Sequence, residues 1–113
     1  MRRYMELVER LRDAVLQGKG KTGPALRQAV AARSAELGGG PAAPPGAAIP
    51  AGLRDLVDKT ALHAYRITDE EIQALLQAGH AEDAIFEIAV SAAVGGGLAR
   101  LERGLAALEG GRR

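Results

Sequence analysis

Three side chains could carry acid–base or ion-binding chemistry in this sequence: His63, Glu87 and Arg100. Glu87 lies in the most apolar segment, residues 84–94, where a carboxylate must be paired or neutralised. Arg100 follows between apolar neighbours, and His63 could act with Glu87 as an acid–base pair if folding brought them together. A solvated or snorkelling position would explain both Glu87 and Arg100 without any chemistry. These three residues are the candidate catalytic residues.

Metal and thiol chemistry find little support in the sequence. His63 and His80 are the only histidines, and neither has a second histidine three or four residues away, as a helical metal site would require. The chain also contains no cysteine. Disulfides, thiolate metal sites and thiol redox centres are therefore excluded from this chain, and with them thiol peroxidase and disulfide oxidoreductase activity. We expect no metal site and no cofactor.

The tripeptide Gly20-Lys21-Thr22 resembles the end of a phosphate-binding P-loop. That motif requires an earlier glycine where this chain has Val15, and it follows a strand, whereas an amphipathic helix is predicted here. We therefore do not expect a nucleotide site at this tripeptide.

Nucleic-acid binding is also not expected. The formal net charge is only +1, far from the basic balance typical of such proteins. Helices predicted over 68–77 and 81–94 could form a helix-turn-helix, but the second has no Arg, Lys, Asn or Gln to contact bases.

The apolar residues recur at steps of three and four, which predicts helices and an all-α fold. Pro24 suits a helix start, Thr68 and Glu71 form a capping-box pattern, and Gly79 suits a helix end. The predicted bundle has about five helices, the last of them long. The expected helices cover residues 4–16, 24–37, 53–67, 68–77 and 81–108.

We interpret residues 1–113 as a single helical domain. Two glycine-rich segments interrupt its helical pattern. Residues 38–51 are rich in Gly, Pro and Ala and are predicted to form an internal linker or loop. The run 95–97 is Gly-Gly-Gly, yet the helical spacing resumes at Leu98. We expect a continuous helix or two coaxial helices, with a close helix crossing at these glycines.

The amino-terminal residues show no apolar run typical of a signal peptide, because a charged amphipathic segment follows Tyr4. Charges also interrupt every candidate for a stretch of about 18 apolar residues. We therefore expect a cytoplasmic protein without a membrane-spanning helix.

The segment from Asp58 to Leu108 resembles the helical repeat of the carboxymuconolactone decarboxylase and alkylhydroperoxidase D-like (AhpD-like) family. The similar features are the Thr-x-x-Glu helix start at Thr68, the turn at Ala78-Gly79, an acidic helix start, and an alanine-rich apolar helix followed by Arg100. The resemblance implies an all-helical protomer that packs its long helix into a homo-oligomer. Peroxidase members use a Cys-x-x-Cys pair, which no position here matches, so no catalytic residue is carried over.

Two functional hypotheses remain open. The first is a helical homo-oligomer of this family type without thiol peroxidase activity. In it, residues 84–101 supply the subunit interface, because the segment is apolar nearly all round. The alternative is a thiol-independent enzyme or small-ligand binder with a pocket along the long C-terminal helix. A small-molecule ligand is thus a possible partner, and neither nucleic acid nor a membrane is an expected one.

Overall fold

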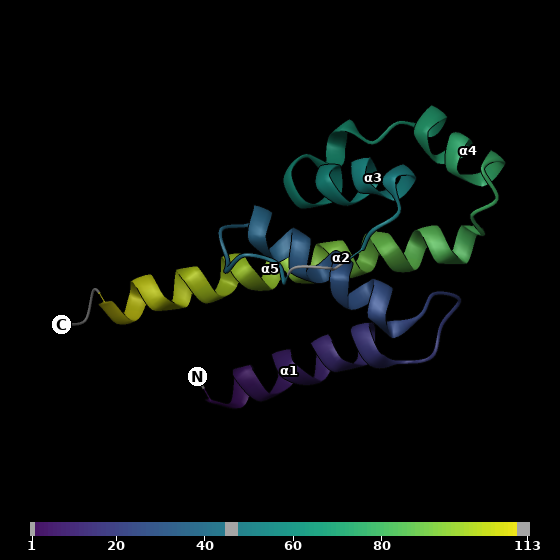
Figure 1. The fold of residues 1–113 in the computed structure, drawn as a ribbon. Coiled ribbons are helices and arrows are strands. Elements are labelled where there is room, and N and C mark those ends of the chain that lie inside the picture. The colour runs from purple at the N-terminus through teal and green to yellow at the C-terminus, as the bar shows by residue number, and fades with distance from the viewer. Residues whose placement is uncertain (1, 45–47, 111–113) are drawn as a thin grey trace.

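The computed structural model describes residues 2–44 and 48–110 (Figure 1). Over these residues it contains helices and no strand, which confirms the predicted all-α class. The elements in chain order are α1 (Arg2–Gln17), α2 (Pro24–Leu37), α3 (Ala51–Leu62), the short 3₁₀ helix η1 (Ala64–Arg66), α4 (Asp69–Gln77) and α5 (Glu82–Gly110).

The long helix α5 is the central element, and α1, α2 and α3 pack along it (Figure 1). It runs through Gly95, Gly96 and Gly97 without a break, as predicted for a continuous helix. Gly95 allows a close crossing of α5 and α2, because a Cβ built there would lie 2.7 Å from Ala31 Cα. At the same crossing the buried Ser34 hydroxyl donates to the carbonyl oxygen of Ala92 at 2.5 Å.

The core lies between α2, α3, α4 and the first half of α5. Val30, Val57 and Ile88 are almost completely buried there. These are medium-sized aliphatic side chains, so each contributes roughly 1.5–3 kcal/mol of burial free energy. A core of this kind leaves only a modest stability margin in a chain of 113 residues.

The segment predicted as a linker is partly anchored. Its described residues lie outside helices up to Pro50, but Ala51 already begins α3, and residues 45–47 lie outside the described part. Ile49 is only 6% exposed and belongs to the core, so this connection packs against the protein instead of spanning freely between helices.

The end of the third helix differs from the prediction. α3 ends at Leu62, whereas a helix to residue 67 was expected. His63 leaves the helical region with φ −149°, and residues 64–66 form the separate η1. The apolar spacing of the sequence does not reveal this break, because it continues across it.

The predicted α4 boundaries are confirmed. The Thr68 hydroxyl accepts a hydrogen bond from the Glu71 N–H at 3.2 Å, which is the first half of the expected capping box. At the other end Gly79 has φ +100°, a left-handed conformation that glycine adopts without strain.

Helix α1 lies at the periphery, below α5 in Figure 1. Among residues 3–17 of this helix only Leu16, near the C-terminal end, is buried, whereas Tyr4, Leu7 and Leu11 are 67%, 52% and 52% exposed. The molecule is elongated, with extents of 53 × 28 × 26 Å. An amphipathic helix thus leaves most of its apolar face in solvent.

Among the described helices, α5 is long and apolar enough to cross a membrane by length and composition. The expectation that charges interrupt every such stretch was therefore too strict. Of the most apolar 18-residue segment of α5, 39% is buried inside the protein. The central helix of a globular fold meets the same criteria, so this finding does not by itself indicate a membrane protein.

Candidate functional site

The three candidate catalytic residues do not form one site: no hydrogen bond or ion pair joins any two of them within residues 2–44 and 48–110. His63 is exposed at the end of α3, and its ring contacts Tyr65 edge-on at 5.8 Å between centroids. Arg100 is on α5, and its Nη2 donates to the carbonyl oxygen of Ala61 at 2.5 Å. This arginine thereby caps the carbonyl end of α3.

Glu87 fastens the loop between α1 and α2 to α5. Its Oε2 accepts the Lys21 N–H at 2.7 Å, and its Oε1 accepts both the Thr22 N–H at 3.0 Å and the Thr22 hydroxyl at 2.7 Å. A Cβ at Gly20 would lie 2.5 Å from Glu87 Oε1, so a larger residue there would displace the carboxylate from these donors. Gly20-Lys21-Thr22 therefore does bind an oxyanion, and that oxyanion is the chain's own carboxylate.

These contacts stabilise the ionised form of Glu87. The hydrogen bond from Lys21 N–H, followed by those from the Thr22 N–H and hydroxyl, holds the pKa of Glu87 below its ordinary value. The positive charge of Arg27 acts in the same direction. A carboxylate kept ionised and occupied by three donors is suited to holding a loop and poorly suited to accepting a proton from a substrate.

Arg27 holds the same loop from inside the protein. It is only 3% exposed, and its guanidinium donates to the carbonyl oxygens of Val15, Gly18 and Thr22. Sequence reasoning missed this residue, because an arginine in a helix with a weak apolar face usually lies in solvent. The one available signal was the number of backbone carbonyls that a glycine-rich loop leaves without helical partners.

The first testable prediction concerns this loop. Glu87→Gln replaces one acceptor oxygen by a donor and removes the charge, so we expect the free energy of unfolding at pH 7 to fall by about 2 kcal/mol. Thr22→Val should cost about 1 kcal/mol, because only the hydroxyl donor is lost. Urea unfolding followed by circular dichroism measures both, and Glu9→Gln, at an exposed position on α1, is the matched control.

The pH dependence should follow with a defined sign. Because the pKa of folded Glu87 is lowered, its stabilisation is present above the unfolded value of about 4.3 and is lost as the pH falls through the lower folded value. The stability difference between wild type and Glu87→Gln should therefore shrink in that acidic range. Glu71, whose pKa is also lowered, is present in both proteins and cancels from the difference. A difference that stays constant between pH 7 and pH 3 would contradict this role.

A second feature is the face of α5 that points away from the core. Seven residues recur along it at steps of three and four, within an arc of about 80° of the helix, and we name them the outer stripe. The outer stripe consists of Phe86, Val90, Ala93, Gly97, Leu101, Gly104 and Leu108.

The outer stripe is apolar although it faces outward. Phe86, Leu101 and Leu108 are 68%, 42% and 63% exposed. None of its seven positions is charged, whereas the solvent face of a helix normally carries charged and polar side chains. Its apolar surface is continuous with that of α1, because Leu11 lines a shallow groove together with Val90 and Ala93.

The middle of the outer stripe is built from small residues. Ala93 and Gly97 are exposed, and a Cβ built on Gly97 would meet no described atom within 4 Å. Gly95 and Gly96 differ, since the same construction brings their Cβ close to Ala31 and Ser34. Packing within the described chain therefore requires small residues at positions 95 and 96. It does not require a glycine at position 97.

Comparisons with known proteins identify no family for this chain. No protein-family model matches it, and neither a curated protein nor a solved structure shows significant similarity.

Proposed function

We propose that this protein functions as a helical homodimer, in which the outer stripe of α5 packs against the same stripe of a second copy. The observation that carries the proposal is that the seven positions of the outer stripe, from Phe86 to Leu108, carry no charge, whereas other exposed positions of α5, such as Asp83 and Glu102, do. A contiguous exposed apolar face of this kind is typical of a protein–protein interface. The role that follows is that of a non-catalytic interaction or scaffold protein.

The outer stripe is complementary to itself. If two copies of α5 cross antiparallel about a two-fold axis at Gly97, residues equidistant from Gly97 face one another. Ala93 then faces Leu101, and Val90 faces Gly104, so each large side chain meets a small residue. Phe86 faces Leu108 at the two ends, where crossing helices diverge and leave room for two large side chains.

Such a pairing would explain why position 97 is a glycine. A glycine inside a helix costs about 1 kcal/mol relative to alanine, and the cost is offset where it lets another backbone approach closely. Two copies related by a two-fold axis present the same patch to each other, which is the commonest arrangement in homo-oligomers. A second copy is therefore the occupant that explains both the apolar surface and the small residues at its centre.

The resemblance to the AhpD-like family, the homo-oligomeric state and the cytoplasmic location stay predictions. The proposal is compatible with all three. It restricts the predicted interface at residues 84–101 to one face of the helix and extends that face along α5 to Leu108. It also makes the apolar face of α1 a flank of the interface, because Leu11 borders the same groove.

Sedimentation equilibrium of the purified protein tests the proposal. At about 50 μM protein we expect a dimer that dissociates on dilution, because an interface of moderate size stabilises by mass action. A monomer throughout the micromolar range would contradict the proposal. Monomers that bind to vesicles of neutral phospholipid would also contradict it and would assign the apolar face to a membrane surface.

A further inference from the structure

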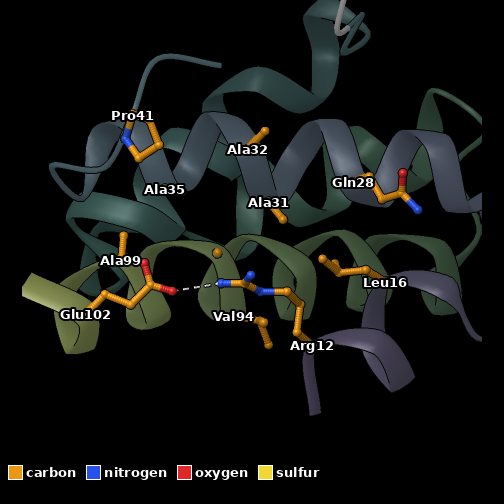
Figure 2. Close-up of a pocket in the computed structure, with 11 residues that line it drawn as sticks. Arg12, Leu16, Gln28, Ala31, Ala32, Ala35, Pro41, Val94, Ala99 and Glu102 are labelled. Carbon is orange, nitrogen blue, oxygen red and sulfur yellow. Dashed lines mark hydrogen bonds and ion pairs between the residues drawn. The ribbon is translucent and has the colours of Figure 1, made fainter. Parts of the chain in front are cut away.

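A cavity of about 300 Å³ lies between α1, α2 and α5 (Figure 2). No residue of the outer stripe lines it. Its walls come from small side chains on two of these helices, with Leu16 contributed by α1. The wall residues used below are Ala31, Ala32 and Ala35 from α2 and Val94, Gly95 and Ala99 from α5.

The cavity exists because the three helices do not approach one another equally. α2 and α5 touch at Gly95 and Ala31, where a larger residue does not fit. Among residues 3–17 of α1, Leu16 is the one that is buried against them, and Ala32 and Ala35 are too short to fill the remaining space. The cavity is therefore open to solvent on one side and mainly apolar in its lining, and an apolar molecule that enters it removes apolar surface from water.

The charged residues of the cavity neutralise each other. Arg12 on α1 and Glu102 on α5 form an ion pair of 3.1 Å across it, with side chains 45% and 50% exposed (Figure 2). The pair leaves no net charge in the cavity that would attract a charged ligand, and a charged group that entered the apolar part would lose hydration. The remaining polar side chain is Gln28, whose amide can donate or accept one hydrogen bond without requiring a charge.

The geometry points to a binding site for a compact, uncharged and mainly apolar molecule of one or two rings. An apolar cavity of roughly 150 Å³ holds one benzene ring, so the space here suits about ten non-hydrogen atoms. The site is independent of the proposed dimer, because the outer stripe does not line it. It provides a specific candidate for the pocket along the long C-terminal helix that the sequence left open.

Titration of the ¹⁵N-labelled protein with indole, followed by its amide resonances, tests this inference. We expect saturable shifts centred on Ala31, Ala35 and Ala99, with a Kd below about 1 mM. Indole-3-carboxylate, which has the same ring and a negative charge, should bind at least about tenfold more weakly. Sedimentation should show the same oligomeric state with and without indole.

Filling the cavity should abolish binding. Ala35→Leu places a larger apolar side chain in the cavity, and we expect at least about a tenfold weaker Kd for indole. Ala32→Leu is a second filling variant if Ala35→Leu does not fold, and Ala25→Leu, at an exposed position of α2, is the matched control. The inference is overturned if indole causes no saturable shifts, or if the filled variants bind it as well as wild type does.

Discussion

Gly95→Ala is expected to lower the free energy of unfolding by about 3 kcal/mol, among the largest effects of any single methyl group in this protein. The added Cβ would lie 2.7 Å from Ala31 Cα and 2.8 Å from its carbonyl carbon. These are backbone atoms of a packed helix, so α2 and α5 would have to separate along their contact. Urea unfolding followed by circular dichroism measures the loss.

Gly97→Ala is the matched control, because it makes the same substitution two residues farther along the same helix. In dilute protein we expect it to raise stability by about 1 kcal/mol through helix propensity, since the new Cβ meets no described atom. At concentrations where the dimer forms, the gain should shrink or reverse, because the methyl group hinders the helix crossing. Equal effects of the two substitutions would contradict the assigned roles of these glycines.

Ala93→Glu is expected to dissociate the dimer, raising its Kd by at least about 100-fold. The substitution places a carboxylate near the centre of the outer stripe in each copy, opposite an apolar residue and without a partner charge. The monomer should remain folded, because Ala93 is exposed within one copy. Sedimentation equilibrium measures the association, and urea unfolding confirms the fold.

Ala106→Glu provides the comparison for this charge. It lies on the same helix at an exposed position, about 180° around the helix axis from the outer stripe. We expect the Ala106→Glu protein to associate like wild type. If both variants dissociated, the added negative charge itself, and not its place on the outer stripe, would explain the loss of the dimer. If neither variant dissociated, the interface would lie elsewhere.

The helices could be predicted from the sequence because each has local signals. The capping residue Thr68 and the turn at Gly79 both act within a few residues, and the structure confirms them. The break at His63 could not be predicted, because it depends on how α3 ends against Arg100 of α5, a residue far along the chain. Tertiary contacts of this kind override local periodicity.

The candidate site was less predictable than the fold. The sequence correctly marked Glu87 as a carboxylate in need of a partner, but its donors lie in a loop 65 and 66 residues earlier in the chain. Arg27 itself gave no sign of burial; the only signal lay in the unpartnered carbonyls of the glycine-rich loop, which come within its reach when α1 ends beside α2. The outer stripe could be seen only once the structure showed which face of an almost entirely apolar helix is buried.

One cross-linking measurement tests the antiparallel pairing of α5 most directly. The chain has no cysteine, so a single introduced cysteine reports one position without background. Gly97→Cys places two thiols near the two-fold axis, within the Cα separation of about 6 Å that a disulfide requires. Val90→Cys lies on the same stripe, but in the antiparallel dimer its two copies are about 21 Å apart, twice seven residues at the helical rise.

A side chain at position 97 weakens the dimer, but a disulfide traps each pair that forms, so the covalent dimer accumulates during mild oxidation. We therefore expect Gly97→Cys to form a covalent dimer, seen by non-reducing electrophoresis, and Val90→Cys to remain monomeric on the gel. A parallel pairing would cross-link both variants. Failure of Gly97→Cys to cross-link while the protein sediments as a dimer would place the interface elsewhere, and either result would contradict the proposed arrangement.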